Sequence, residues 1–140
     1  MAWQLRSFLD ADYAQLPALF ALLEPAVPVA DVIERSLRMR AAGWQCLGCF
    51  EGERLIAMAG YIERIHLYAG SVLYVENVAV LPDRRGEGLG QVLMDALAEL
   101  ARARGCSSLT LDAYASNGPA RAFYERLGYE PRGIHYVYDL

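Results

Sequence analysis

The segment spanning residues 80–105 constrains the fold more than any other part of the chain. It reads VLPDRRGEGLGQVLMDALAELARARG, with Gly86, Gly88 and Gly90 at alternate positions and no further glycine until Gly105. Free backbone N–H groups at a helix N-terminus, together with the helix dipole, bind anions such as phosphates. Glycines allow close approach of the backbone and unusual φ angles. The segment therefore predicts a phosphate-binding turn that opens a helix.

The flanking sequence supports a β-α-β unit around this turn. Residues 71–81, SVLYVENVAVL, are rich in β-branched side chains and end before a proline, which predicts a buried strand. Residues 88–104 carry leucines at helical spacing, and Gly105 ends the predicted helix. The next stretch, CSSLTLDAY, predicts a further strand.

The rest of the chain predicts a mixed α/β fold. The expected sheet is mostly antiparallel and twisted, with flanking helices, in a single domain over residues 1–140. The other predicted elements are a strand at 3–9, a helix opened by Asp10, a helix at 29–43, a hairpin of 44–51 and 54–64, a short helix at 118–128, and one or two strands at 129–140.

Composition excludes several classes of function. A net charge of −4 argues against a nucleic-acid-binding protein, which usually needs a basic face. No apolar run approaches the roughly 20 residues that cross a bilayer, and the N-terminus lacks a basic-then-apolar signal pattern. We therefore expect a cytoplasmic protein with no membrane or nucleic-acid partner.

Three cysteines bear on metal binding. Cys46 and Cys49 form a CxxC pair, but a zinc site needs a second ligand pair with short spacing, and only Cys106 and two scattered histidines remain. The pair lies in a predicted strand and not at the start of a helix. We expect small buried hydrophobic residues and no metal.

Two known phosphate-binding patterns fit the turn poorly. The P-loop requires a lysine, and this chain contains none. The dinucleotide pattern GxGxxG matches Gly86 and Gly88, but its third position falls on Gln91. Asp112 lies where a ribose-binding acid would stand. However, a dinucleotide-binding β-α-β unit normally opens its domain, whereas here it lies in the middle of the chain. A nicotinamide-dependent enzyme stays an alternative.

A third pattern fits better. RGEGLG, from Arg85 to Gly90, reads R-x-x-G-x-G, and at this point the chain resembles the GCN5-related N-acetyltransferase (GNAT) family. The stretch SNGPARAFYERLGYE, residues 116–130, is similar to the later motif of that family. Two motifs in the right order and spacing are more specific than either alone, and the resemblance covers nearly the whole chain.

The resemblance implies acetyl-CoA as donor and an amine as acceptor, without a metal. It implies that Asn117 contacts the pantetheine, and that backbone groups of Val78 and Val80 pair with the acetyl and pantetheine arm. The residues implied to hold the pyrophosphate through their amides are Arg85, Gly86, Gly88, Gly90 and Gln91. The early helices would shape the acceptor site, and family members commonly dimerise. A module that binds acetyl-CoA without turnover is a second alternative.

The implied chemistry needs a base and an acid. A protonated amine cannot attack, so a base must remove its proton, and the leaving thiolate benefits from an acid. The resemblance places the Tyr124 hydroxyl near the thioester sulfur. Glu76 and Asp112 both qualify as base, and Glu76 is favoured because a charge is costly in an apolar strand unless it is used or paired. Each of these residues also has a competing structural role. Tyr124 could be a core aromatic and Asn117 a helix cap, and either carboxylate could form an ion pair with an arginine.

Overall fold

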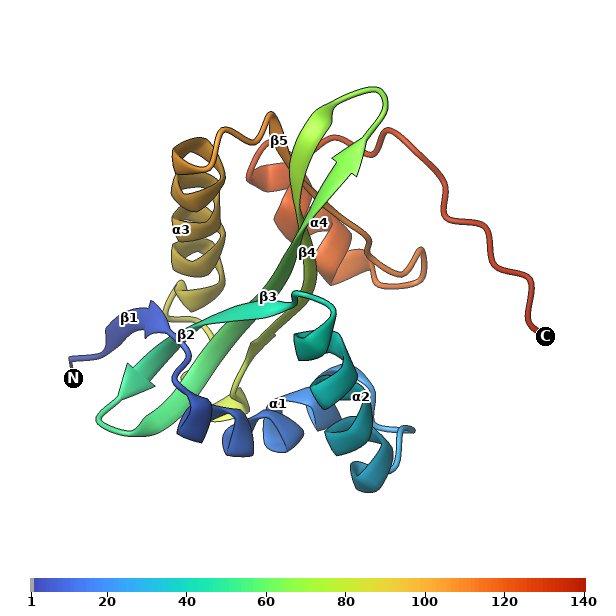
Figure 1. Cartoon of the computed structure of the whole chain (residues 1–140). Helices are drawn as coiled ribbons and strands as arrows, with labels where there is room; N and C mark the ends of the chain where they lie inside the picture. Colours follow the sequence, from blue (N-terminus) through green and yellow to red (C-terminus); the bar gives the residue numbers. More distant parts are fainter. Residues whose placement is uncertain (1) are drawn as a thin grey trace. The chain divides into compact units, whose positions relative to one another are not determined.

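Five strands form one sheet in the order β1-β2-β3-β4-β5, as described by a computed structural model of residues 2–140 (Figure 1). β1 to β4 pair antiparallel with their sequence neighbours. The strands are β1 (Gln4–Ser7), β2 (Gln45–Glu51), β3 (Arg54–His66), β4 (Gly70–Val80) and β5 (Ser108–Leu111). The predicted hairpin and the predicted buried strand are confirmed.

The helices follow the predicted order. The α-helices are α1 (Leu16–Leu23), α2 (Val29–Ala41), α3 (Leu89–Ala103) and α4 (Gly118–Arg126), and the 3₁₀ helices are η1 (Asp10–Gln15) and η2 (Pro82–Arg84). None of the helices within residues 2–140 is long and apolar enough to cross a membrane. The chain divides into two compact units, one ending at Thr110 and the other spanning Leu111–Leu140. The single domain over residues 1–140 stays a prediction.

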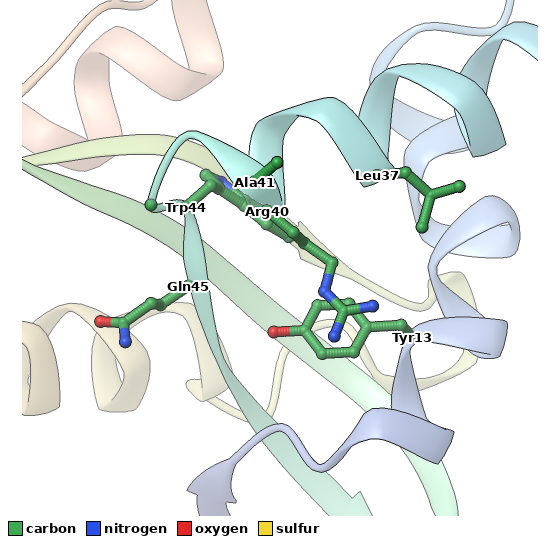
Figure 2. Close-up of a pocket in the computed structure, with 7 residues that line it drawn as sticks. Tyr13, Leu37, Arg40, Ala41, Trp44 and Gln45 are labelled. Atoms are coloured by element: carbon green, nitrogen blue, oxygen red, sulfur yellow. The ribbon is translucent and has the colours of Figure 1, made fainter.

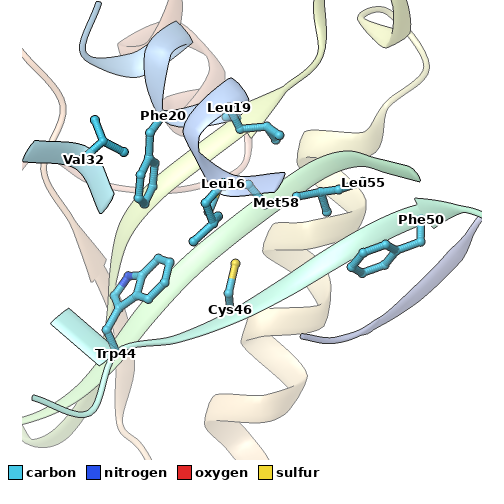
Figure 3. Close-up of a cluster of buried hydrophobic side chains, with 10 residues drawn as sticks. Leu16, Leu19, Phe20, Val32, Trp44, Cys46, Phe50, Leu55 and Met58 are labelled. Atoms are coloured by element: carbon cyan, nitrogen blue, oxygen red, sulfur yellow. The ribbon is translucent and has the colours of Figure 1, made fainter. Parts of the chain in front are cut away.

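One face of the sheet packs against α1 and α2 (Figure 3). The buried side chains of this cluster are Leu16, Leu19, Phe20, Val32, Trp44, Cys46, Phe50, Leu55, Met58 and Ala79. Trp44 needs Gly60 beneath it, because a Cβ on Gly60 would lie 2.3 Å from the indole ring. A side chain at position 60 would therefore displace Trp44 from the core.

The opposite face packs against α3, which lies behind the strands in Figure 3. The buried residues of α3 recur every three or four positions and are Leu89, Leu93, Met94, Leu97 and Ala101. This stripe matches the predicted helical face. It fixes the helix to the sheet and thereby fixes the loop that precedes it.

Two sequence-based expectations are wrong. The carboxylate that caps η1 belongs to Asp12 and not to Asp10: the Leu9 N–H donates to Asp12 Oδ2 at 2.6 Å. Residues 129–140 form no strand. The apolar side chains of residues 134–140 lie in solvent, with Tyr136 87% and Tyr138 88% exposed. Strand-forming residue types do not make a strand unless a neighbouring strand completes the ladder.

Candidate cofactor and acceptor site

The glycine-rich loop joins η2 to α3 and takes a left-handed backbone twice. Gly86 has φ of +85° and Gly88 has φ of +78°, a region that residues with a side chain rarely adopt. Apart from the adjoining residues, a Cβ at either position would meet no atom of residues 2–140 within 4 Å. The protein's own packing therefore leaves open space over both glycines, where a ligand could approach the backbone.

The N-cap residue of α3 supplies no capping side chain. Gly88 is its N-cap, makes no side-chain cap hydrogen bond, and is followed by no acid in the first turn. The first N–H groups of a helix lack partners within the helix and carry the positive end of its dipole. Buried Leu89 anchors this end, while Arg85 and Gln91 are exposed. The arrangement can bind an anion.

The second half of β4 turns a free edge toward the β5 side of the sheet. The Leu81 N–H donates to Ile56 O on β3 at 2.9 Å. Because N–H and C=O directions alternate along a strand, the backbone groups of Val80 and Val78 point away from β3. β5 has four residues against eleven in β4 and starts beside Ser71, whose carbonyl accepts from Ser107 N at 2.9 Å. β5 therefore does not extend along this half of β4.

Glu76 is the extra residue of a β-bulge in β4. Gly60 pairs with Asn77 and Tyr61 with Val75, which leaves Glu76 without an opposite residue. Its Oε1 accepts from Arg64 Nη2 at 3.1 Å. The structure thus shows the ion pair with arginine that competed with a catalytic role.

A pocket of about 470 Å³ lies beside α2, on the face of the sheet that packs against α1 and α2 (Figure 2). The Arg40 guanidinium stacks 3.6 Å above the centre of the Tyr13 ring, and its Nη2 pairs with Asp10 Oδ1 at 3.2 Å. The pocket is lined by Tyr13, Leu37, Arg40, Ala41, Gly43, Trp44 and Gln45. Six of these residues lie at positions 37–45, and Tyr13 is brought to them from η1, a contact that no sequence motif marks.

The pocket and the bulge share neighbours. Trp44 lies over Gly60, which pairs with Asn77 beside Glu76. A Cβ on Gly43 would lie 3.9 Å from Ile62, and Ile62 pairs with Tyr74. The pocket therefore borders the strand segment in which Glu76 lies.

In the second unit, Asn117 caps α4. Its Oδ1 accepts from Ala120 N at 3.1 Å, and Pro119 occupies the first turn. The capping role is thus confirmed. Asp112 Oδ2 lies 3.4 Å from His135 Nδ1. Asp112 accordingly has a partner within its own unit.

Tyr124 lies two turns along the same helix. Its ring meets the Phe123 ring at 5.1 Å and the Tyr129 ring at 5.7 Å between centres, both edge-on. Burial raises the pKa of the Tyr124 phenol. A raised pKa keeps the phenol protonated to a higher pH than an ordinary tyrosine.

Both cysteines of the CxxC pair are buried in β2. Burial raises the pKa of Cys49 to about 11 and that of Cys46 well above its ordinary value, so both are neutral thiols at neutral pH. The prediction of small buried hydrophobic residues is confirmed. Within residues 2–140, no group of three or more His, Cys, Asp or Glu side chains is placed to hold a metal ion.

Arg84 is a feature of the loop that sequence reasoning missed. Its side chain is only 11% exposed and pairs with both Glu51 and Glu87. The three-residue spacing between Arg84 and Glu87 was visible in the sequence. The contact with Glu51, which is 33 residues away, was not.

Comparison with known proteins gives one family and one fold. The family model for the acetyltransferase (GNAT) family matches residues 8–129. A ribosomal protein bS18-alanine N-acetyltransferase of Escherichia coli K12 is 40% identical over 62 residues, which are 44% of this chain and 42% of that protein. The chain thus matches less than half of the length of such curated relatives.

Solved structures extend the likeness to the whole chain. An acetyltransferase of Trypanosoma brucei has 27% identity and a TM-score of 0.80, covering 99% of this chain and 100% of that one. An aminoglycoside N-acetyltransferase in complex with CoA has a TM-score of 0.85 at 18% identity, covering 99% of this chain and 95% of that one. At such low identity the second match shows the fold alone.

Proposed function

The chain belongs to the GNAT family of acetyltransferases, and on that premise we propose that it moves an acetyl group from acetyl-CoA to an amine by direct attack. One observation carries the proposal. The loop at residues 85–91 has two left-handed glycines with open space above them, and it leads into a helix whose N-cap residue, Gly88, makes no side-chain cap hydrogen bond. This is the geometry that a pyrophosphate needs.

The pantetheine arm would run along the open edge of β4. The backbone groups of Val78 and Val80 point to this edge, and an extended arm can pair with them as an added strand would. Amides of Arg85, Gly86, Gly88, Gly90 and Gln91 would hold the pyrophosphate. Asn117 would contact the arm with the part of its side chain that the helix cap leaves available.

Two side chains would move protons. Glu76 would take the proton of the amine, directly or through water, and Tyr124 would give its proton to the departing sulfur. The amine nitrogen bonds to the carbonyl carbon, the C–S bond breaks, and CoA leaves as a thiol. The oxyanion formed in between needs a backbone N–H donor, which the open edge of β4 can supply.

The acceptor would bind in the pocket of Tyr13, Arg40, Trp44 and Gln45, which borders the Glu76 segment. Relatives acetylate different amines, an alanine of a ribosomal protein in one case. We further propose a cytoplasmic enzyme that needs no metal, binds neither membranes nor nucleic acid, and dimerises as family members commonly do.

The proposed function is tested by binding and then by turnover. Calorimetry should show that CoA binds, whereas NAD, the ligand of the alternative nucleotide-binding class, should not. A panel of amines is then screened for release of free thiol from acetyl-CoA. Binding of NAD in place of CoA would refute the assignment. Binding of CoA with no thiol release across peptide, sugar and polyamine acceptors would favour the binding-only module.

Glu76→Gln should lower kcat at neutral pH by roughly 10²- to 10⁴-fold, the usual contribution of a general base. Amide and carboxylate have nearly the same shape, so the loss reflects basicity. Rates should recover in part as pH rises, because more of the amine then loses its proton unaided. A pH–rate profile of wild type and variant measures this recovery.

Glu63→Gln is the matched control. Glu63 lies in β3, and its carboxylate also faces an arginine, with Oε1 3.6 Å from Arg104 Nη1. Loss of the Glu63 carboxylate should leave the pH–rate profile unchanged. If Asp112→Asn gives the pH-dependent loss and Glu76→Gln does not, Asp112 is the base and Glu76 only pairs with Arg64.

A further inference from the structure

The Arg84 guanidinium joins two carboxylates from different parts of the fold. Its Nε and Nη2 donate to the two carboxylate oxygens of Glu87 at 2.7 and 3.0 Å, and its Nη1 donates to Glu51 at 2.6 Å. Glu51 ends β2, and Glu87 lies in the glycine-rich loop. Only 11% of the Arg84 side chain is exposed. The contact with Glu87 is therefore a bidentate, largely buried salt bridge, which is stronger than an exposed surface ion pair.

Glu87 stands in an unfavourable place for an anion site. It lies between the two left-handed glycines, Gly86 and Gly88, at the entrance to the uncapped helix. A free carboxylate there would repel a pyrophosphate. The hydrogen bonds from Arg84 hold the pKa of Glu87 below its ordinary value, so the carboxylate stays ionised and protonation does not remove its charge. The Arg84 guanidinium, which also pairs with Glu51, must offset that charge instead.

The same contact restrains the shape of the loop. Arg84 is the last residue of η2, and Glu87 follows three residues later, so the bidentate pair closes the turn that contains Arg85 and Gly86. The bond to Glu51 ties that turn to the end of β2. A loop held in its binding conformation before the ligand arrives loses less entropy on binding.

We propose that Arg84 is a positioning residue for acetyl-CoA. It draws the Glu87 side chain toward β2, offsets part of its charge, and leaves the loop amides and exposed Arg85 to face the pyrophosphate. The inference rests on the proposed function, because it assigns the loop to acetyl-CoA. Arg84 itself need not touch the ligand.

Four variants test this. Arg84→Gln should weaken CoA binding by about 10- to 100-fold, the range expected when hydrogen bonds to a charged group are lost. Glu87→Gln should change binding by less than about threefold, because Arg84 already offsets that carboxylate and the amide oxygen of the variant can still accept a hydrogen bond from Arg84. The double variant should recover most of the affinity lost in Arg84→Gln. Calorimetry with CoA measures all three.

Arg54→Gln, the fourth variant, is the matched control. Arg54 pairs with Asp83 of the same η2, at 3.1 Å, from the start of β3. It thus joins the same short helix to the same hairpin, but through an exposed pair that includes no loop carboxylate. CoA affinity should be unchanged in this variant, even if its melting temperature falls.

Two donors separate positioning from general stability. With acetyl-CoA, kcat/KM should fall in Arg84→Gln, whereas with S-acetylpantetheine, which lacks the pyrophosphate, it should stay at the wild-type value. If Arg84→Gln does not fold, Arg84→Lys is used instead, because lysine keeps the positive charge but cannot form the bidentate contact. In that variant kcat/KM should fall by a smaller factor, and only with acetyl-CoA.

Several results would overturn the inference alone. These are wild-type CoA affinity in folded Arg84→Gln, equal losses with both donors, or a double variant as weak as Arg84→Gln. Failure of the wild-type chain to bind CoA would instead overturn the proposed function, and this inference with it.

Discussion

Gly88→Val is expected to abolish CoA binding while the protein stays folded. Valine at φ of +78° costs about 1–3 kcal/mol in backbone strain, which is less than the roughly 5–15 kcal/mol that stabilises an ordinary domain. Apart from the two neighbours of Gly88 in the chain, no atom of residues 2–140 lies within 4 Å of the added Cβ, so the Cβ itself brings no further clash. The branched side chain would instead fill the space over the loop amides. Calorimetry with CoA and a thermal melt measure the two effects.

Gly105→Val separates backbone strain from ligand exclusion. Gly105 follows the C-terminal end of the same helix and has φ of +74°, and apart from its chain neighbours no atom of residues 2–140 lies within 4 Å of its Cβ position. The two variants should lose similar stability, and only Gly88→Val should lose CoA binding. Wild-type CoA affinity in folded Gly88→Val would refute the assignment of the loop to the pyrophosphate.

Tyr124→Phe should reduce kcat by roughly 10²- to 10⁴-fold, the usual contribution of a general acid. Phenylalanine keeps the ring and its edge-on contacts with Phe123 and Tyr129, so acetyl-CoA affinity and the melting temperature should barely change. Steady-state turnover, with CoA calorimetry and thermal melts alongside, tests all three.

The raised pKa of Tyr124 gives this prediction a pH signature. A phenol acts as an acid only while it is protonated, and burial extends that range upward. The wild-type rate should therefore fall only above the ordinary tyrosine pKa of about 10. This alkaline decline should be absent from the residual activity of Tyr124→Phe.

Tyr129→Phe makes the same chemical change in the tyrosine that packs against Tyr124. It should leave kcat unchanged. A fall of less than about tenfold in Tyr124→Phe would mean that the thiolate leaves unaided. A large loss of stability with normal residual turnover would show that Tyr124 is a core aromatic only.

Local sequence was sufficient for the elements around the loop. Glycine at alternate positions between a β-branched run and a leucine stripe predicted strand, turn and helix, and β4 and α3 lie within a residue or two of their predicted bounds. The reason is physical: backbone freedom at Gly88 and burial of a periodic face are properties of neighbouring residues. The cap at Asn117 is local in the same sense, since its partner is three residues away.

Long-range packing decided the rest. The tie between Arg84 and Glu51 joins residues 33 positions apart, and the bulge at Glu76 depends on which β3 residue lies opposite, so neither is visible in a local pattern. Residues 129–140 show the converse, because their alternating aromatic and β-branched side chains favour a strand and form none. Sequence alone thus determined the turn and the helix that present the amides. Only tertiary structure decided which strand edges stay open and which charges are paired, because both depend on partners far away along the chain.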